Sequence, residues 1–526
     1  MGLVEVSGLS YALPGGRTLF DDVSLRVGAG EHVALIGANG SGKTTLLRLL
    51  CDEERAPVGS VRIEGRSRFM RQLMGSTTDD GTVRELLLSL SPAPLRRAAK
   101  ELDDATRAAQ DEPGERSGMR VARAHAGWGD AGGYEAEVLW DVCATAALGC
   151  SFDAVADRMR STLSGGEQKR LALEVLLRCD AEVLLLDEPD NFLDVPAKEW
   201  LEDELTRCPK TVLFVSHDRE LLARTATKII TLEGRVAWTH PSSFATYRAA
   251  RSERLDRIDE EHRRYTEERV RLEASLREFR RRAQMGSDTF ASRVRATKTK
   301  IERFERGAPP ERAREQHISM RLGGDRTGKR AVAIEGLEIA GLTDPFDTEI
   351  LFGERIGVIG HNGTGKSHFL KLLAGHPIAH GGEFMLGARV VPGYFSQVHE
   401  QLETPASVLL EHLQEKGRTR GEAMAALRRY ELHDAWNQPL ATLSGGQQAR
   451  FQILLLELSG ATLLLLDEPT DNLDLASADA LEAALAQFQG TALIVTHDRW
   501  LMRGCDRFLV FGRDCTVRET LEPVYR

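Results

Sequence analysis

The sequence predicts an α/β protein in which two copies of one P-loop domain are joined by a long α-helical hairpin. Two observations carry this prediction: four motifs occur twice in the same order, and a basic, charge-rich segment lies between the two sets. A chain of 526 residues has room for three or four domains of ordinary size. Its 42% hydrophobic and 28% charged residues are typical of a core-forming globular protein and exclude collagen-like or low-complexity chains.

The repeated motifs define two domains, which we expect over residues 1–247 and 331–526. In chain order the pairs are GANGSGKT and GHNGTGKS, LSGGEQKR and LSGGQQAR, LLLDEPDNFLD and LLLDEPTDNLD, and VSHDR and VTHDR. Self-similarity of this kind identifies a duplicated structural unit.

The spacing of the motifs locates an insertion in the first copy. Gln72 and Gln397 are 325 residues apart, whereas Ser164 and Ser444 of the later LSGG motifs are 280 residues apart, a difference of 45 residues. We expect the additional residues to form a short helical insertion at about 92–133. Within it, LRRAAKELDDATRAAQ predicts a polar helix, and EPGERSG and GWGDAGG predict loops.

The segment between the domains, residues 248–330, is expected to be a helical hairpin. It contains 24 Lys and Arg against 15 Asp and Glu, a net charge of +9, while the rest of the chain carries −19. No Gly or Pro interrupts 248–283, which predicts one helix of 36 residues and about 54 Å. A second helix is expected over about 289–306. Such a charge run is usually a solvated spacer held by ion pairs, but its positive excess suits a polyanionic partner equally well.

Each glycine-rich motif follows an apolar strand and precedes an apolar helix, which is the context of a phosphate-binding loop. Its glycines allow backbone N–H groups to surround phosphates, the lysine neutralises the β and γ phosphates, and the next hydroxyl binds Mg²⁺. The candidate nucleotide-binding residues are Gly37, Asn39, Gly40, Gly42, Lys43, Thr44 and Thr45 in the first copy, and Gly360, Asn362, Gly363, Gly365, Lys366, Ser367 and His368 in the second.

The LLLDEP motifs predict a buried strand that ends in two carboxylates. The first carboxylate, Asp187 or Asp467, lies where a Mg²⁺ ligand is needed. The second, Glu188 or Glu468, is placed to polarise an attacking water. The alternative is that each acid pair makes ordinary loop contacts, which the phosphate loops in the same domains make less favourable.

The LSGGEQ and LSGGQQ motifs resemble the LSGGQ signature of the ATP-binding cassette family, and the resemblance covers nearly all of 1–247 and 331–526. It implies an ATPase that uses ATP and Mg²⁺. It also implies that the two cassettes pair head to tail within a monomer, so that each signature faces the phosphate loop of the other cassette. The signature residues are Ser164, Gly165 and Gly166, expected to face Lys366, and Ser444, Gly445 and Gly446, expected to face Lys43.

The resemblance also implies a glutamine beside the nucleotide in each cassette. Gln72 in FMRQL and Gln397 in YFSQV match this position. With these glutamines, the implied Mg²⁺ ligands are Thr44 and Asp187 in the first cassette and Ser367 and Asp467 in the second.

A histidine and an aromatic residue complete the implied site. His217 and His497 match the switch histidine, each 29 residues after the glutamate of its own cassette, and a catalytic role is implied for both. Family members usually stack adenine on an aromatic residue upstream of the phosphate loop. Tyr11 fits that place, whereas Phe346 in the second cassette is equally consistent with a core position.

The whole chain resembles the ABC-F subfamily, whose members are ATPases that act on the ribosome. It has tandem cassettes, a charged hairpin between them, no apolar stretch long enough to cross a membrane and no visible signal peptide. The resemblance implies a cytoplasmic protein that binds the ribosome with its cassettes closed on ATP. Its hairpin would contact rRNA and point toward the P-site tRNA and the peptidyl-transferase centre, and hydrolysis would release it.

Six basic residues near the expected hairpin tip are candidates for contact with RNA phosphates, where neutralised charge releases counterions. They are Arg281, Arg282, Arg293, Arg295, Lys298 and Lys300. At the tip, Met285 and Phe290 either meet an apolar or base surface or join the two helices.

Two questions about function stay open in the sequence. The subfamily includes both regulators of translation and proteins that protect the ribosome from antibiotics. The alternative class is the ATPase subunit of a drug-efflux transporter with separate membrane proteins, although membrane docking does not need an 83-residue charged linker.

The two cassettes depart from DEPTNHLD, which is common in the subfamily. Asp190 and Phe192 replace Thr and His in the first cassette, and Asp471 replaces Asn in the second. The carboxylates in the hydrolysis role are present in both. We therefore expect two competent sites with unequal rates.

Overall fold

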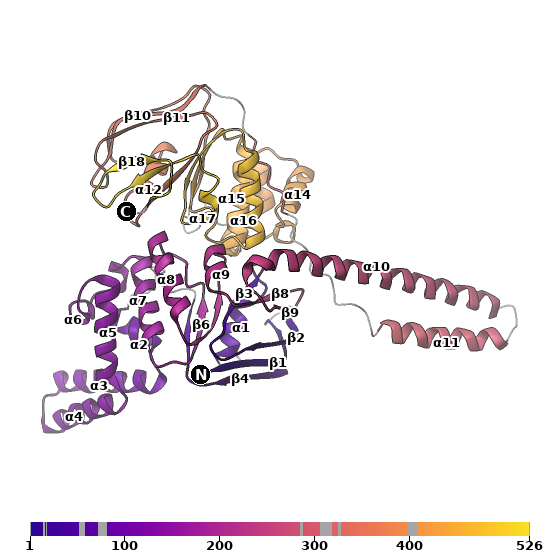
Figure 1. Cartoon of the computed structure of the whole chain (residues 1–526), viewed down its shortest axis with the longest axis horizontal. Coiled ribbons are helices and arrows are strands. Elements are labelled where there is room, and N and C mark those ends of the chain that lie inside the picture. The colour runs from indigo at the N-terminus through magenta and orange to yellow at the C-terminus, as the bar shows by residue number, and fades with distance from the viewer. Residues whose placement is uncertain are drawn as a thin grey trace.

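The computed structural model describes residues 2–13, 16, 18–51, 58–71, 81–283, 288–305, 318–323, 328–396 and 408–524. Two α/β halves lie against each other, and a helical hairpin projects from their junction (Figure 1). The predicted fold class is confirmed, because each half combines a mainly parallel core sheet with helices and a long helical connection joins them. Within the described residues, no helix is long and apolar enough to cross a membrane.

Each half is organised around a six-stranded core sheet with the same strand order. The order is β5-β6-β7-β3-β8-β9 in the first half and β14-β15-β16-β12-β17-β18 in the second, and only the last strand of each is antiparallel. The central strands are buried along their whole length, as expected for parallel strands covered on both faces. The strands are β3 (His32–Gly37), β5 (Ser67–Met70), β6 (Val183–Asp187), β7 (Thr211–Val215), β8 (Lys228–Glu233), β9 (Val236–His240), β12 (Arg355–Gly360), β14 (Pro392–Phe395), β15 (Leu463–Asp467), β16 (Thr491–Val495), β17 (Arg507–Phe511) and β18 (Val517–Thr520).

A three-stranded antiparallel sheet forms a second layer in each half. Its order is β2-β1-β4 in the first half and β11-β10-β13 in the second. In each half, residues of this sheet pack in one cluster with residues of the core strands and of the helix after the phosphate loop. The strands are β1 (Leu3–Ala12), β2 (Thr18–Val27), β4 (Val58–Glu64), β10 (Arg330–Ile339), β11 (Phe346–Leu351) and β13 (His380–Leu386).

The helices occupy corresponding places in the two halves, apart from the insertion. In the first half they are α1 (Lys43–Leu50), α2 (Val83–Leu90), α3 (Ala93–Asp111), α4 (Glu115–Asp130), α5 (Gly133–Leu148), α6 (Phe152–Val155), α7 (Gly165–Arg178), α8 (Val195–Arg207) and α9 (Arg219–Thr225), with a 3₁₀ turn η1 (Arg160–Thr162). In the second half they are α12 (Lys366–Leu373), α13 (Leu409–Glu415), α14 (Arg420–Arg429), α15 (Gly445–Ser459), α16 (Leu475–Gln487) and α17 (Arg499–Met502), with η2 (His433–Ala435) and η3 (Leu440–Thr442).

The glycine-rich motifs turn the chain from a core strand into a helix. Strand β3 ends at Gly37 and α1 begins at Lys43; in the second half, β12 leads in the same way to Lys366. The residues before these lysines, Gly42 and Gly365, both have φ of 97°, a left-handed conformation that glycine adopts without steric cost. The turn therefore places each lysine at the N-terminus of a helix.

The insertion is more helical than the sequence indicated. Helix α3 contains the predicted polar helix, but α4 continues through Gly127, Trp128 and Gly129, where a loop was expected. That prediction was wrong, because Trp128 is buried against Trp140 of α5. Each glycine weakens a helix by about 1 kcal/mol, and burial of a large aromatic side chain outweighs that cost.

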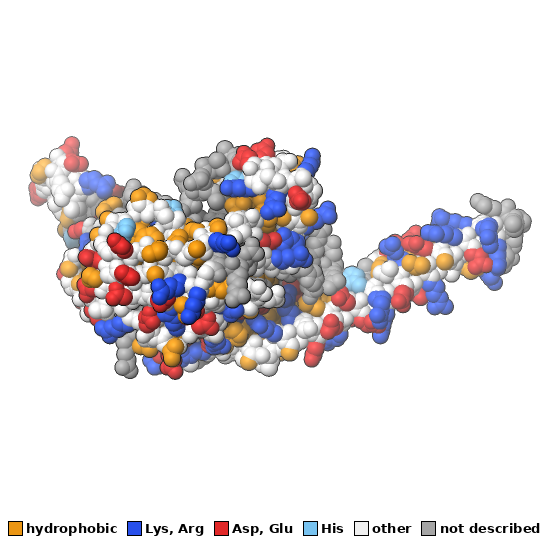
Figure 2. Space-filling view, turned by 90° about the horizontal axis from the view of Figure 1, so that it is seen from above, with side chains coloured by type: hydrophobic (Ala, Val, Ile, Leu, Met, Phe, Trp, Pro, Cys, Tyr) orange, Lys and Arg blue, Asp and Glu red, His pale blue; other side chains and the backbone are white. Residues whose placement is uncertain are grey.

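The helical hairpin consists of α10 (Phe244–Ala283) and α11 (Asp288–Glu305). Helix α10 begins four residues earlier than expected, because Phe244 and Tyr247 pack into the core of the first half. Along the shaft, the rings of Tyr265 and Phe304 stack at 4.6 Å and hold the two helices together. Lysine and arginine side chains gather toward the outer end of the hairpin (Figure 2).

Trp140 is expected to anchor the insertion to the first half, since its ring lies 6.3 Å from Trp128 and 5.3 Å from Phe152. Trp140→Ala should lower the free energy of unfolding by about 3–5 kcal/mol, because it leaves a cavity between three helices. Urea denaturation would measure this change. The matched control on the same helix is Val138→Ala, which is 68% exposed and should change stability by less than about 0.5 kcal/mol. Equal effects of the two changes would contradict the anchoring role.

Candidate functional site

The two phosphate-loop lysines are held by the backbone of their own loops. Lys43 Nζ donates to the carbonyl oxygens of Gly37 at 2.8 Å and Ala38 at 3.2 Å. Lys366 Nζ donates to those of Gly360 at 2.8 Å and His361 at 2.6 Å. Burial lowers the pKa of both lysines, and nearby carboxylates, Glu188 and Glu468 first, partly oppose it. Each loop therefore positions a cation beside backbone N–H groups, as phosphate binding requires.

Strand-end carboxylates lie beside the hydroxyl that follows each lysine. In the second half, Ser367 Oγ donates to Asp467 Oδ1 at 3.1 Å. In the first half, burial raises the pKa of Asp187, the nearby Thr44 hydroxyl opposes that rise, and neither carboxylate oxygen has a hydrogen-bond partner within the described residues. These hard oxygen donors fit Mg²⁺, which takes only one or two protein ligands when it is bound to a nucleotide. The described residues contain no cluster of three or more His, Cys, Asp or Glu suited to a metal.

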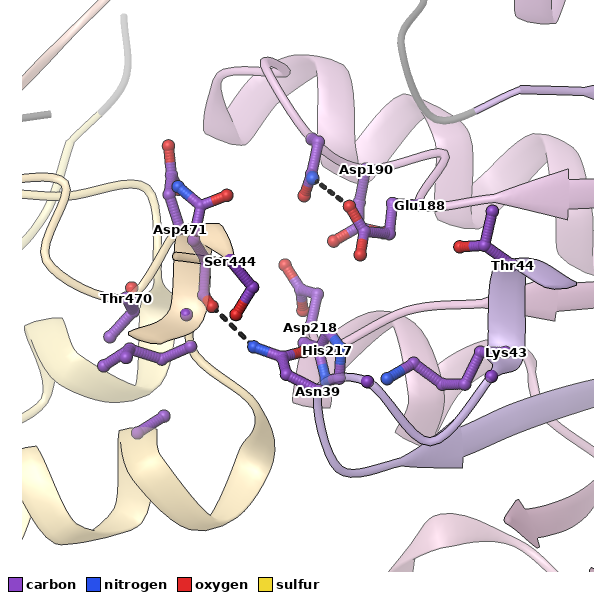
Figure 3. Close-up of a pocket in the computed structure, with 18 of the residues that line it drawn as sticks. Asn39, Lys43, Thr44, Glu188, Asp190, His217, Asp218, Ser444, Thr470 and Asp471 are labelled. Atoms are coloured by element: carbon purple, nitrogen blue, oxygen red, sulfur yellow. Dashed lines mark hydrogen bonds between the residues drawn. The ribbon is translucent and has the colours of Figure 1, made fainter. Parts of the chain in front are cut away.

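Two of the cavities at the interface between the halves combine the phosphate loop of one half with the signature motif of the other. The first is about 450 Å³ and the second about 350 Å³. Figure 3 shows the first, with Lys43 and Thr44 on one side and Ser444 of the other half facing them. The first cavity is lined by Asn39, Gly40, Gly42, Lys43, Thr44, Thr45, Glu188 and His217 together with Ser444, Gly445 and Gly446. The second is lined by Asn362, Gly363, Gly365, Lys366, Ser367, His368, Asp467, Glu468 and His497 together with Ser164, Gly165 and Gly166.

The asparagine of each phosphate loop bonds to the other half. Asn39 Nδ2 donates to the Asn472 carbonyl at 2.8 Å, and its backbone N–H donates to Asp474 Oδ2 at 3.1 Å. Asn362 Nδ2 donates to the Phe192 carbonyl at 3.2 Å. The structure thus brings the two halves together head to tail, in the arrangement that the resemblance implied.

Each LSGG motif begins a helix that points at the cavity of the other half. Ser164 caps α7 and Ser444 caps α15, each accepting a hydrogen bond from the third residue of its helix. Unpaired N–H groups and the helix dipole make such an end favourable for an anion. A Cβ on Gly166 would lie 2.8 Å from the Phe192 carbonyl oxygen of its own half and 3.3 Å from Asn362 Nδ2 of the other half. A Cβ on Gly446 would lie 2.9 Å from the Asn472 carbonyl oxygen of its own half and 2.2 Å from Asn39 Nδ2 of the other half. Only glycine fits this close approach.

The glutamate after each core strand has a different neighbour in the two halves. Asn191 Nδ2 donates to Glu188 Oε2 at 2.6 Å. The corresponding residue of the second half is Asp471, which cannot donate in its ionised form. Burial first, and then Asp471 and Asp467, raise the pKa of Glu468 well above its usual value. The two halves therefore hold their glutamates in different electrostatic surroundings.

The two histidines also differ. His497 Nε2 lies 3.4 Å from Glu468 Oε1 and 3.2 Å from Asn362 Oδ1, and its backbone N–H donates to Glu468 Oε2 at 3.0 Å. Neither ring nitrogen of His217 has a hydrogen-bond partner within the described residues. Burial, followed by the charge of Lys43, lowers the pKa of His217 to about 3, and the pKa of His497 is also well below its usual value. Both rings are therefore neutral at pH 7.

Paired arginines and glutamates flank the cavities. Arg219 NH1 donates to Glu482 at 2.7 Å, and Arg499 pairs with Glu202 at the equivalent place. The start of the hairpin also contacts the second half, because Arg248 of α10 donates to Asp479 Oδ1 at 2.9 Å. The halves are therefore joined by charged pairs as well as by the two sites.

The predicted adenine platforms are not in the cavities. The ring centroids of Tyr11 and Phe20 are 6.4 Å apart, and Tyr11 packs against the core of the outer sheet. Leu13 and Leu19 line the first cavity instead. Phe346 is buried with other aromatic rings of the second half, so the core alternative applies.

The remaining predicted residues are the two glutamines, the apolar pair at the hairpin tip and the basic candidates for RNA contact. Gln72, Gln397 and Met285 fall outside the described residues, as does the side chain of Phe290. The six basic RNA-contact candidates are all exposed: Arg281 and Arg282 lie at the end of α10, and Arg293, Arg295, Lys298 and Lys300 lie along α11.

Sequence reasoning did not single out Lys198 of α8, although it lines both cavities with Asp190, Asn191 and Asp471. No motif includes this lysine. A residue-by-residue comparison of the two copies could have found it, because Ala478 occupies the equivalent position.

The sequence of this chain is similar to those of known ATP-binding cassette proteins. A family profile described as ABC transporter matches residues 20–191 and 344–471. An "Antibiotic resistance protein" of Mycobacteroides abscessus is 50% identical over 99% of this chain and 100% of its own length. The "Tylosin resistance ATP-binding protein TlrC" of Streptomyces fradiae is 34% identical over 92% of both chains. "ABC transporter F family member 5" of Arabidopsis thaliana is 28% identical over 93% of this chain and 72% of its own.

The chain belongs to the ABC-F family of ATP-binding cassette proteins. It is an ATPase of the P-loop type. Among solved structures, the archaeal ribosome recycling factor aABCE1, in complex with ribosomal stalk protein aP1, shares the fold of this ABC-F protein. The TM-score is 0.57 at 20% identity, over 96% of this chain and 87% of that one.

Gly446→Ala should impair closure of the first site, because the new Cβ would meet Asn39 across the interface. We expect ATP turnover to fall by about tenfold, since displacements of about 1 Å at a reacting centre are costly. Phosphate release would measure turnover, and small-angle scattering with ATP would measure compaction. The control is Gly421→Ala in α14, where a Cβ has no neighbour within 4 Å. Unchanged turnover and compaction for Gly446→Ala would contradict this close approach.

Proposed function

We propose that this ABC-F ATPase protects the ribosome against an antibiotic. It binds the ribosome with both cassettes closed on ATP, directs its hairpin toward the P-site tRNA and the peptidyl-transferase centre, and is released by hydrolysis. The observation that carries the proposal is the exposed basic outer end of the hairpin on an otherwise acidic chain. A polyanionic partner would be attracted there and repelled elsewhere.

The named relatives support resistance as the biological role. One is an antibiotic resistance protein and another a tylosin resistance protein, and the first is half identical along its whole length. This ABC-F protein would therefore act on ribosomes that carry a bound drug in the cytoplasm. Regulation of translation without a drug is the other outcome that the experiment below distinguishes.

Two composite sites would hydrolyse ATP. In the first, Lys43 and the backbone of its loop would bind phosphate oxygens from one half, and Ser444 with the N-terminus of α15 would bind them from the other. Glu188 and Glu468 would polarise the attacking water in their respective sites. His217 and His497, being neutral, could each bond to a phosphate oxygen or to that water.

Mg²⁺ would be held by Thr44 with Asp187 and by Ser367 with Asp467, where it neutralises charge on the β and γ phosphates. Because the phosphates contact both halves only when these are closed, ATP would act as a switch on the interface.

Glu188→Gln combined with Glu468→Gln should lower ATP turnover by about 10²–10⁴-fold, because glutamine cannot act as the base. Phosphate release would measure the loss, with Glu199→Gln, an exposed glutamate of α8, as the control. The double variant should also pellet with 70S ribosomes when ATP is present and remain in solution without it. Turnover close to that of the unaltered protein would refute the assignment of the bases.

Changing Arg281, Arg282, Arg293 and Arg295 to Glu should weaken ribosome binding by at least about tenfold and reduce its salt dependence, since phosphate contacts are lost. ATP turnover without ribosomes should not change. The control reverses four exposed arginines of the second half, Arg389, Arg420, Arg428 and Arg518, which gives the same change of net charge. Equal loss of binding in both variants would exclude a specific role of the hairpin.

Translation in vitro separates resistance from regulation. With tylosin as the inhibitor, the unaltered protein should restore synthesis, and the hairpin variant should not. If the protein changes synthesis only in the absence of the drug, regulation is the correct role. If it binds no ribosomes under any condition, the ribosomal proposal is wrong.

A further inference from the structure

A buried group of charged residues between the two ATP sites occurs in the first half only. Its members are Lys169, Asp190 and Lys198, whose counterparts 280 residues later are Ala449, Thr470 and Ala478. Lys169 is fully buried and Asp190 is 5% exposed. These three positions are therefore charged in the first cassette and uncharged in the second.

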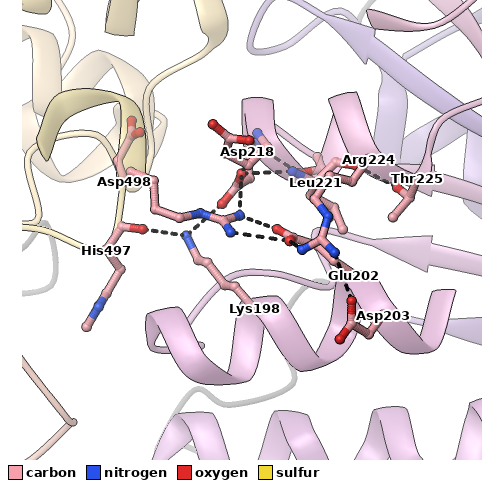
Figure 4. Close-up of polar contacts among 12 residues, drawn as sticks. Lys198, Glu202, Asp203, Asp218, Leu221, Arg224, Thr225, His497 and Asp498 are labelled. Atoms are coloured by element: carbon pink, nitrogen blue, oxygen red, sulfur yellow. Dashed lines mark hydrogen bonds and ion pairs between the residues drawn. The ribbon is translucent and has the colours of Figure 1, made fainter. Parts of the chain in front are cut away.

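Lys198 connects the two halves at this centre. Its Nζ lies 3.1 Å from Asp218 Oδ2 within the first half and donates to the backbone carbonyl of His497 in the second at 3.4 Å (Figure 4). Asp218 directly follows His217. One ammonium group therefore contacts the histidine loops of both cassettes.

The surroundings keep this lysine charged. Burial alone lowers the pKa of Lys198, but the carboxylates of Asp218, Asp190 and Asp471 outweigh it and hold the pKa above its usual value. Asp190 Oδ1 has no hydrogen-bond partner within the described residues. Removing the ammonium would leave these carboxylates close together with less compensating charge, since Arg499 beside Asp218 and Lys169 near Asp190 would remain.

The contact to the second half acts on a constrained segment. His497 donates its backbone N–H to Glu468, and its ring lies near Glu468 and Asn362. A shift of the His497 backbone would therefore move the group that orients Glu468. In the first cavity, Ala478 stands in the place of the lysine and cannot make the equivalent contact.

We propose that Lys198 is a positioning residue for the second ATP site, which it serves from the first cassette by holding the His497 loop. The His217 loop of the first site is held within its own half, through the pairing of Lys198 with Asp218, and Ala478 supplies no contact to it from the second half, so the two sites depend unequally on closure of the interface. The inference rests on the proposed role of Glu188 and Glu468 as bases, because those residues allow each site to be observed alone.

The test introduces Lys198→Met into two backgrounds of the full-length protein. Methionine keeps the unbranched shape of the lysine side chain but removes its charge. Glu188→Gln leaves the second site active, and Glu468→Gln leaves the first. Lys198→Met should lower kcat about tenfold in the Glu188→Gln background with little change in KM for ATP, because orientation rather than binding is lost. In the Glu468→Gln background, kcat should fall by a smaller factor of about two, because the first site loses only the pairing of Lys198 with Asp218, and Arg499 remains beside that carboxylate. Lys198→Arg should restore most of the second-site activity.

Two further variants separate positioning from general damage. The double variant Asp190→Thr with Lys198→Ala recreates the Thr470 and Ala478 pair of the second cassette. No unpaired carboxylate then remains at position 190. This variant should show the same selective loss of second-site activity. Lys228→Met removes a partly buried lysine that pairs with Glu31 away from both cavities and should affect neither background.

The outcomes are distinguishable. Equal loss in both backgrounds, no loss in the Glu188→Gln background, or no recovery with Lys198→Arg would overturn the positioning role. If Glu188→Gln and Glu468→Gln themselves leave turnover unreduced, the assignment of the bases fails instead.

Discussion

Each of the two cavities that contain a phosphate loop is lined by residues of both halves, and this dependence on the other half shapes the whole structure. The phosphate loop of one half faces the signature helix of the other so closely that a Cβ on Gly446 would lie 2.2 Å from Asn39 Nδ2, and one on Gly166 would lie 3.3 Å from Asn362 Nδ2. The interface between the halves is joined by charged pairs, such as Arg219 with Glu482, and by an apolar cluster in which Val195 packs with Ile359, Met502 and Phe508. Contacts of both kinds occur between domains that move relative to each other.

The same interface fixes the root of the hairpin. Asp479 pairs with Arg219 next to the first site and with Arg248 at the start of α10. Both arginines also stack on Trp500, at 5.2 Å and 5.6 Å. Opening the cassettes would break these contacts together, so the orientation of a helix of 40 residues is tied to the state of the ATP sites. In the proposed cycle, this link would turn a nucleotide change into a movement of the basic end.

Duplication supplied two similar sites, and later divergence made them different. Asn191 bonds to one glutamate, whereas Asp471 raises the pKa of the other. Lys198 contacts the histidine loops of both cassettes, whereas the side chain of Ala478, at the equivalent position, is too short to make such a contact. With Lys198 in the proposed positioning role, such differences would give a two-site ATPase an ordered response, because one site would depend more strongly on the other half.

The sequence by itself determined the repeated cassettes, the two phosphate loops and the helical hairpin, because glycine spacing and apolar patterning act within short stretches of chain. It did not decide that GWGDAGG is mostly helical or that Tyr11 packs beside Phe20. The burial of Trp128 and the packing of the outer sheet settled those points. The sequence also did not indicate the contact of Lys198 with His497, because the two residues are 299 positions apart. Contacts between segments so far apart depend on how the halves pack, and no local pattern specifies that packing.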